Sequence, residues 1–163
     1  MFEERVSVAI ENALVSLAAY LIGHYFTGLF HDSSSRIGGL WSLIAAIVVL
    51  QATSRDTWKS AALRALGTLI GAILGGLYLY FFPFTAIGMA VSVGLTVLLC
   101  QALKVPDHGR LAAGTVALIM VISSGNPELS PFANAALRFI ESVIGASIAV
   151  LAVLIWPKAK SAA

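Results

Sequence analysis

The sequence predicts an all-α, polytopic membrane protein with six transmembrane helices arranged as two inverted three-helix repeats. The prediction rests on composition, on six apolar runs and on an internal repeat. Apolar residues make up 59% of the chain and charged residues 11%, against about 45–50% and about 25% in soluble domains. A chain of 163 residues has too little interior to hide so much apolar surface from water, whereas lipid solvates the outer faces of a membrane protein.

Polar segments separate the six apolar runs, and Pro or Gly stands at several of the breaks. The runs cover about residues 6–30, 37–52, 61–82, 85–103, 111–122 and 132–156. A spanning helix needs about 20 apolar residues, so we expect residues 1–163 to form one membrane domain without a soluble domain. The runs should be helical because lipid offers no partner to an open backbone group. A β-barrel is disfavoured, because the sequence shows no ten-residue alternation of polar and apolar side chains.

Each run ends at a recognisable break. The first ends at a polar segment beginning with His31, the second is followed by polar residues 53–60, and the third ends at Pro83. The fourth ends at Lys104, and a loop with one Gly and two Pro, 123–131, precedes the sixth. The fifth run is the shortest. To cross the membrane, its helix must also include residues 109–110 and 123–124; otherwise it lies tilted or inside the protein.

The distribution of Lys and Arg predicts the orientation, because cytoplasmic segments are rich in both. With the N-terminus inside, only Arg36 and Arg138 fall outside. The eight basic residues inside are Arg5, Arg55, Lys59, Arg64, Lys104, Arg110, Lys158 and Lys160. We therefore predict a multi-pass protein of the bacterial inner membrane with both termini cytoplasmic. Aromatic residues at 78–84 suit an interfacial belt at the outer end of the third run.

The internal repeat relates residues 61–72 to residues 135–146. Seven of the twelve aligned pairs are identical, and the offset between Arg64 and Arg138 is 138 − 64 = 74. The same offset relates Arg36 to Arg110, without a gap. Two three-helix copies, about residues 6–82 and 85–156, would enter the membrane from opposite sides because three is odd. Such inverted repeats are common in secondary transporters, whose substrate sites lie near the repeat interface.

Arg64 and Arg138 are the candidate anion-binding residues. An arginine within a span usually faces a partner or a watery cavity, and its planar fork matches a carboxylate. Both arginines are expected near the start of a helix, where free backbone N–H groups also favour anions. The alternatives are contact with lipid headgroups, or an ion pair of Arg138 with Glu141. For Arg36 and Arg110 a headgroup or topology role is favoured.

Glu141 and His24 are candidates for proton coupling. Glu141 is the most interior carboxylate and replaces Gly67 of the first copy, so it breaks the symmetry. A carboxylate in the membrane can carry a proton, although pairing with Arg138 is the alternative. His24 lies inside the first run and can titrate near neutral pH, but a packing role is the alternative there.

Small residues predict close helix packing. Glycines recur at four-residue spacing on one face of the third run, and a further glycine stands on the matching face of the sixth, where small side chains let helix backbones approach. These glycines are Gly67, Gly71, Gly75 and Gly145.

No catalytic, cofactor or metal motif stands out. A lone Cys100 allows neither an intramolecular disulfide nor a cysteine metal cluster. The sequence contains no metalloprotease motif, nucleophile elbow or phosphate-binding loop. We therefore predict that the chain is not an enzyme and needs no cofactor. A net charge of +2 is too small to suggest a nucleic-acid partner.

Three stretches resemble the membrane domain of the fusaric-acid-resistance-like proteins, also called the aromatic acid exporter family. They are residues 41–49, 51–53 and 62–72, and the motif that carries the resemblance is Arg64, Gly67, Thr68 and Gly71. The same stretch is similar to the plant aluminium-activated malate transporters. The resemblance implies a six-helix membrane domain that handles organic anions, with Arg64 in contact with the anion. Arg138 receives this role through the repeat alone.

The leading hypothesis is therefore a gradient-driven efflux transporter of small organic anions, with aromatic carboxylates as the expected substrates. A passive anion channel and a non-transporting membrane scaffold or partner subunit are the alternatives. The expected partners are membrane lipid, the anion and further copies of the chain. Larger members of the resembled family carry a cytoplasmic domain or a second membrane half, and a homo-oligomer would compensate for their absence here.

Overall fold

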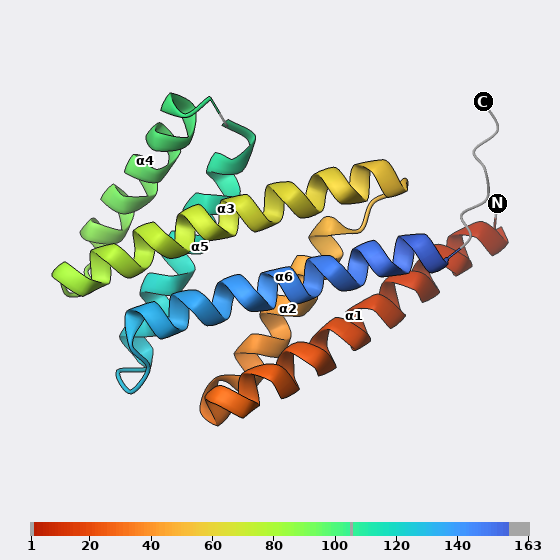
Figure 1. Ribbon diagram of the computed structural model, residues 1–163, viewed down its shortest axis with the longest axis horizontal. Coiled ribbons are helices and arrows are strands. Elements are labelled where there is room, and N and C mark those ends of the chain that lie inside the picture. Colours follow the sequence, from red (N-terminus) through yellow and green to blue (C-terminus); the bar gives the residue numbers. More distant parts are fainter. Residues whose placement is uncertain (1, 105, 157–163) are drawn as a thin grey trace. The chain divides into compact units, whose positions relative to one another are not determined.

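The computed structural model describes residues 2–104 and 106–156, with the backbone alone described at 2–5 and 106–108. Throughout these ranges every regular element is a helix (Figure 1), so the predicted all-α class is confirmed. The elements are α1 (Phe2–Phe30), η1 (Asp32–Ser34), α2 (Ser35–Val49), α3 (Ser54–Phe81), α4 (Ala86–Ala102), α5 (Pro106–Gly125) and α6 (Pro131–Ile155). Lys158 and Lys160, which were expected at the cytoplasmic side, lie outside the described residues.

Within the described ranges, three helices are long and apolar enough to cross a membrane. They are Val6–Phe30 of α1, Ser54–Phe81 and Pro131–Ile155. The chain is thus a membrane protein with several spans. Helices α4 and α2 have 17 and 15 residues, which makes them short for a hydrocarbon core of about 30 Å. Six crossings and the cytoplasmic placement of the termini remain predictions.

The largest departure from the predicted helix limits is at the start of α3. We expected the third helix over residues 61–82, after the polar residues 53–60, but α3 begins at Ser54. Thr53 acts as its cap: its Oγ1 accepts a hydrogen bond from the Asp56 N–H at 3.1 Å and donates one to Asp56 Oδ2 at 2.6 Å. An acidic residue in the first turn also favours the helix through its dipole. Capping therefore outweighs the polarity of this segment.

Helix α5 is longer than the apolar run that predicted it. It begins at Pro106, a favourable first helical residue, and ends at Gly125. The helix includes the flanking residues that the fifth run needed in order to cross the membrane, 109–110 and 123–124.

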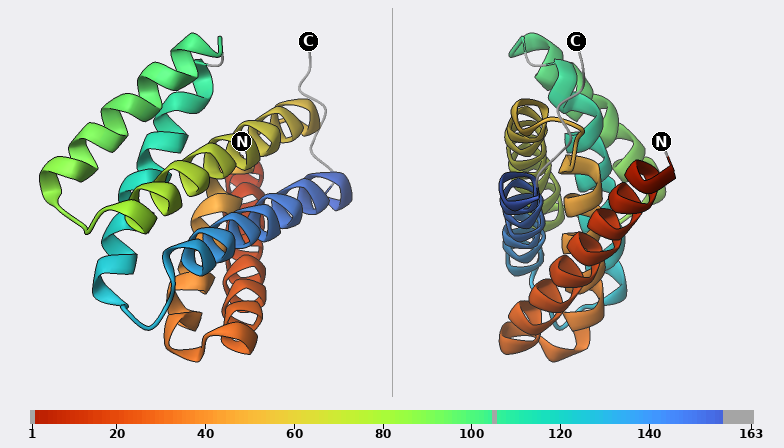
Figure 2. Two further views of the ribbon diagram at one scale, coloured as in Figure 1. Left: turned by 60° about the vertical axis from the view of Figure 1, so that its left-hand side comes forward. Right: turned by 90° about the vertical axis from the view of Figure 1, so that its right-hand side faces the viewer.

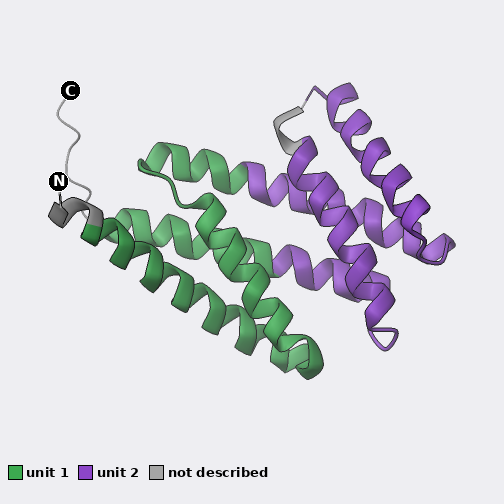
Figure 3. Ribbon diagram, turned by 180° about the vertical axis from the view of Figure 1, so that it is seen from behind, with its two compact units in different colours: residues 1–62, 141–163 green, residues 63–140 purple. Residues whose placement is uncertain are grey.

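The chain divides into two compact units, and the division falls within α3 and α6 (Figure 3). Unit 1 comprises residues 1–62 and 141–163. In it α1 and α2 pack side by side (Figure 2). Its core consists of small and branched apolar residues from these two helices and from the second half of α6. The buried members are Val15, Ala19, Ala46, Val49, Ala146 and Ala149.

Unit 2 comprises residues 63–140, with α4 and α5 packed on each other. Its core is built by Ala72 of α3, Ile119 of α5 and Ala135 of α6, all buried. Thr85 caps α4, since its hydroxyl accepts a hydrogen bond from the Gly88 N–H at 3.0 Å. This fixes where α4 begins after the break at Pro83.

Glycines bring helix backbones together within each unit. In unit 2, a Cβ built on Gly71 of α3 would lie 2.5 Å from the Ala112 carbonyl oxygen of α5, and one on Gly75 would lie 3.4 Å from Ile119. In unit 1, a Cβ on Gly145 of α6 would lie 2.0 Å from the Ser42 carbonyl oxygen of α2. Real Cβ atoms do not approach other atoms as closely as at Gly71 and Gly145, whereas the 3.4 Å at Gly75 is an ordinary contact distance. Thus α3 meets α5 at Gly71, and α6 meets α2 at Gly145. Gly67 is also buried in α3.

Candidate functional site

Three buried side chains from three helices of unit 1 meet at Glu141. Thr27 of α1, Ser42 of α2 and Glu141 of α6 each have 0% of their surface exposed. Thr27 Oγ1 donates a hydrogen bond to Glu141 Oε1 at 2.6 Å, and Ser42 Oγ donates one to the Glu141 carbonyl oxygen at 3.0 Å. A hydroxyl bound to an ionised carboxylate makes a short, strong hydrogen bond. We call these three residues the Glu141 cluster.

Two glycines make room for the Glu141 cluster. A Cβ on Gly38 of α2 would lie 2.0 Å from Thr27 Oγ1 and 2.6 Å from Glu141 Oε1. A Cβ on Gly23 of α1 would lie 2.2 Å from Ser42 Oγ. The polar atoms therefore occupy the space that side chains at these two positions would need. The cluster is built into the packing of α1, α2 and α6.

His24, the second candidate for proton coupling, stands among tyrosines on α1. Its ring is stacked on Tyr20 with centroids 5.8 Å apart, and it meets Tyr25 edge-on at 5.5 Å. Among the described residues its Nδ1 is buried without a hydrogen-bond partner. His24 precedes Thr27 by three residues, one helical turn away. Its described contacts are those of a packed aromatic ring.

The two candidate arginines lie in unit 2 and are buried. They do not lie at helix starts, as we expected, because α3 begins at Ser54 and α6 at Pro131, so both arginines lie beyond the first turn. Arg64 of α3 is 5% exposed and Arg138 of α6 is 0% exposed. The other repeat-related pair, Arg36 of α2 and Arg110 of α5, is exposed. A guanidinium that is buried inside a membrane protein is costly and usually has a functional role. Burial also keeps it from the lipid headgroups, which a snorkelling side chain must reach.

Asn134 is a buried polar residue that the sequence did not single out. It lies on α6 four residues before Arg138 and is 0% exposed. Its amide group donates to the Ile119 carbonyl oxygen of α5 at 3.3 Å and to Ser123 Oγ at 2.9 Å. An asparagine one turn before an arginine, inside an apolar run, is the signal that could have found it. It ties the first turn of α6 to the end of α5.

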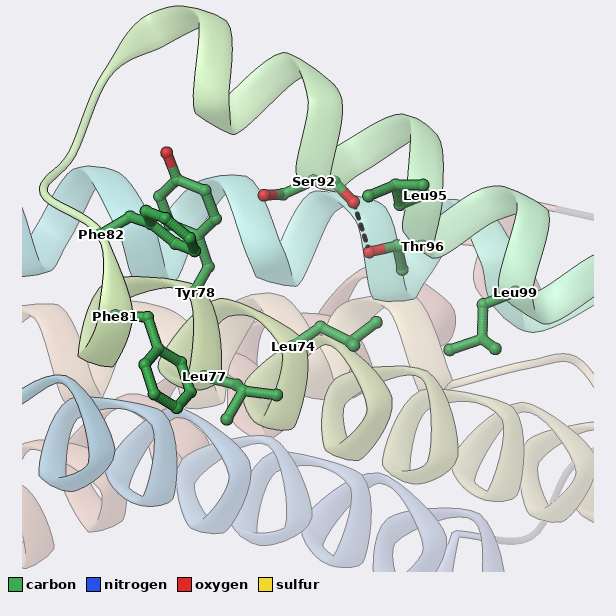
Figure 4. Close-up of a pocket in the computed structure, with 9 residues that line it drawn as sticks. All are labelled: Leu74, Leu77, Tyr78, Phe81, Phe82, Ser92, Leu95, Thr96 and Leu99. Carbon is green, nitrogen blue, oxygen red and sulfur yellow. Dashed lines mark hydrogen bonds between the residues drawn. The ribbon is translucent and has the colours of Figure 1, made fainter.

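An apolar pocket lies between the end of α3 and α4 in unit 2 (Figure 4). Its volume is about 420 Å³. The lining consists of leucines, aromatic rings and two hydroxyl residues: Leu74, Leu77, Tyr78, Phe81, Phe82, Ser92, Leu95, Thr96 and Leu99. The Thr96 hydroxyl donates to the Ser92 carbonyl oxygen of its own helix at 2.7 Å. The lining can hold an apolar group, but it carries no charge with which to bind a carboxylate.

Sequence reasoning found Glu141 but neither of the hydroxyls that bind it. Thr27 and Ser42 are separated from Glu141 by 114 and 99 residues. Hydroxyl residues are common in membrane helices, and nothing in the local sequence distinguishes these two. Gly23 and Gly38 each lie within an apolar run, and only the fold relates them to a polar group.

Comparison with known proteins identifies the family. The family model described as fusaric acid resistance protein-like matches residues 14–152, a range that reaches into all six helices. A UPF0421 protein of Halalkalibacterium halodurans is 32% identical over 84 residues, which are 52% of this chain and 23% of that protein. The match thus spans about a quarter of the relative's length. No solved structure matches the chain.

The family match confirms the resemblance that the motif around Arg64 predicted. The matched range covers most of the chain and contains the motif, the Glu141 cluster and the pocket. The protein is therefore a multi-pass membrane protein that belongs to the fusaric acid resistance protein-like family.

Proposed function

We propose that this protein transports small organic anions, aromatic carboxylates above all, out of the bacterial cell, driven by an ion gradient. The observation that carries the proposal is the burial of Arg64 and Arg138 in two helices long enough to cross the membrane. Membership of the fusaric acid resistance protein-like family supports the same class of function.

The chemistry of the two arginines supports an anion as the substrate. A guanidinium stays charged under all ordinary conditions and presents a planar fork that two carboxylate oxygens can accept. The contrast with the exposed Arg36 and Arg110 favours a role inside the protein for Arg64 and Arg138. The aromatic part of a carboxylate substrate requires an apolar surface, which the predominantly apolar span helices supply.

We further propose that the chain consists of two inverted three-helix repeats. A two-fold axis that exchanges the repeats carries α3 onto α6 and α5 onto α2. The glycine contacts support this relation, because α3 meets α5 in unit 2 and α6 meets α2 in unit 1. The neighbours of Gly75, Val116 and Ile119, lie 74 residues after the neighbours of Gly145, Ser42 and Ala45. The two glycines themselves are 70 residues apart, so the packing corresponds to within one helical turn.

A homo-oligomer in the inner membrane, with both termini cytoplasmic, completes the proposal. The curated relative is about four times as long as the segment it shares with this chain. The distribution of Lys and Arg supports this orientation.

The proposal is tested by anion flux in liposomes that contain the purified full-length protein. Radiolabelled benzoate serves as the probe, with and without an imposed pH gradient. Accumulation against the benzoate gradient that depends on the pH gradient supports the transporter. Downhill flux alone would instead indicate a passive channel, and equal flux with and without protein would indicate a scaffold.

Arginine variants test the site. Arg64→Ala should weaken the apparent affinity for benzoate by about 10- to 100-fold, since hydrogen bonds to charged groups contribute about 1.5–3 kcal/mol. Arg64→Lys should recover part of the affinity. Arg110→Ala, which removes an exposed arginine, is the matched control. If Arg64→Ala left flux and selectivity among anions unchanged, the arginine site would be wrong.

A further inference from the structure

We propose that the Glu141 cluster is the site that takes up and releases the coupling proton, with Thr27 as the residue that positions the carboxylate. This inference rests on the proposed gradient-driven transport and names the residues through which the gradient acts. It selects Glu141 over His24, the other ionisable candidate of unit 1.

The geometry distinguishes Glu141 from an ordinary surface carboxylate. It lies in the interior of α6, 0% exposed, and its Oε1 receives the Thr27 hydroxyl at 2.6 Å. The Ser42 hydroxyl holds the main chain of the same residue at 3.0 Å. A buried carboxylate in a membrane helix is costly, and such residues commonly carry protons or ions. His24, by contrast, is half-buried, and its described ring contacts are with Tyr20 and Tyr25 of its own helix.

The Thr27 hydroxyl can serve both protonation states of Glu141. When the carboxylate is ionised, Thr27 Oγ1–H donates to Oε1. When a proton binds, the new O–H of the carboxylic acid can donate to Thr27 Oγ1 instead, and the threonine hydroxyl hydrogen turns away. One O–H bond forms at the carboxylate and its charge falls from −1 to 0. No other covalent bond changes, and in the proposed cycle the proton comes from water on one side of the membrane and leaves to water on the other.

The close packing around the cluster links the proton to the helices. Thr27 Oγ1 and Glu141 Oε1 occupy the position that a side chain on Gly38 would need. Ser42 Oγ occupies the position that a side chain on Gly23 would need. A reversal of the hydrogen bond at Oε1 therefore acts directly on the junction of α1, α2 and α6. Helix packing is sensitive to small changes in such contacts, because packed interiors have discrete arrangements.

Other ionisable groups on these three helices set the electrostatic surroundings of Glu141. Apart from the charged first residues of α1, they are Glu11, Tyr20, His24 and Tyr25 on α1, Arg36 on α2 and Arg138 on α6. Arg138 precedes Glu141 by three residues on the same helix. His24 precedes Thr27 by three residues, and Arg36 precedes Gly38 by two. The test must therefore separate titration of Glu141 from that of His24.

Two measurements on the full-length protein test the proposal. The first is an infrared titration in lipid, without substrate, which follows the C=O stretch of protonated carboxyl groups against pH. The second is benzoate transport in liposomes, measured both as gradient-driven accumulation and as exchange of labelled for unlabelled benzoate without a pH gradient. The variants are Glu141→Gln, Thr27→Val, Thr27→Ser and His24→Gln. Thr115→Val is the matched control, because Thr115 is a buried threonine whose described hydrogen bond is to the Leu111 carbonyl oxygen of its own helix.

The proposal predicts distinct results for these variants. Glu141→Gln should lose one titrating carboxyl band and gradient-driven accumulation, yet keep exchange. Thr27→Val should change the midpoint of that band, because it removes a hydrogen-bond donor to the carboxylate. Thr27→Ser, His24→Gln and Thr115→Val should leave the midpoint near that of the natural protein.

The contrary outcomes are equally definite. If Glu141→Gln retained the full set of titrating bands, or accumulated benzoate with an unchanged dependence on the pH gradient, Glu141 would not be the proton site. Loss of accumulation in His24→Gln with exchange intact would assign the proton to His24 instead. If the natural protein failed to exchange benzoate at all, the proposed substrate class would be wrong. The infrared titration would still decide whether Glu141 binds a proton.

Discussion

The contact between Gly145 of α6 and α2 makes the sharpest prediction about stability. A Cβ at this position would lie 2.0 Å from the Ser42 carbonyl oxygen and 2.9 Å from Ala45 Cβ, whereas carbon atoms in favourable contact are about 3.5–4.0 Å apart. The nearest atom belongs to the backbone, so no rotation of a side chain relieves the overlap. In Gly145→Ala, therefore, α6 and α2 must separate locally.

The expected cost follows from two opposing terms. Overpacking of a well-packed interior costs about 1–3 kcal/mol, and we place Gly145→Ala at the upper end because backbone must move. Alanine returns up to about 1 kcal/mol through its higher helix propensity. Gly94 and Gly114 have no atom within 4 Å of a built Cβ, so Gly94→Ala and Gly114→Ala gain the propensity without overlap. The difference between the two classes should approach about 3 kcal/mol, or about 6–12 °C in Tm for a chain of this size.

The assay is thermal unfolding of the purified variants in one detergent, followed by the fraction that remains monodisperse after heating. Gly145→Ala and Gly71→Ala should be the least stable, Gly75→Ala intermediate because its nearest contact is 3.4 Å, and Gly94→Ala the most stable. Gly28→Ala, whose nearest contact is 3.6 Å, is the control within unit 1. If Gly145→Ala were as stable as Gly94→Ala, the close approach of α6 to α2 would be refuted.

Three further substitutions test local features by the same thermal assay. Thr85→Ala removes the cap that accepts from the Gly88 N–H and should cost about 1 kcal/mol, whereas Thr85→Ser should cost little; equal losses in both would contradict the cap. Lys104 has a φ of 59° just after α4, so Lys104→Gly should stabilise by about 1 kcal/mol and Lys104→Ala should not. Asn134→Leu removes two hydrogen bonds to α5 and should destabilise by about 1–3 kcal/mol; unchanged stability would show that Asn134 does not tie α6 to α5.

Composition and apolar runs were sufficient to predict the helical class, because a bilayer leaves few alternatives to a helix. The limits of the helices were less predictable. The start of α3 was missed because residues 53–60 are polar, and only the reciprocal hydrogen bonds between Thr53 and Asp56 show that they begin a helix.

The candidate site was predictable only where a residue is unusual in its own surroundings. Arg64, Arg138 and Glu141 stand out because charged side chains are rare within apolar runs. Thr27 and Ser42 do not stand out, since their importance depends on a carboxylate more than 90 residues away. Periodicity within one run carries no information about which helix will lie opposite.

The proposed repeat does not duplicate the Glu141 cluster in the second copy. The offset of 74 relates Glu141 to Gly67, and Ser42 and Gly38 to Val116 and Ala112. The same offset relates Thr27 of α1 to Gln101 of α4. The second set contains neither a carboxylate nor a pair of hydroxyls. Whereas the arginines occur in both copies, the ionisable carboxylate occurs in one. An inverted repeat with two anion-binding arginines but one proton site would take up one proton per chain in each cycle, and the side from which Glu141 is reached would set the direction of coupling.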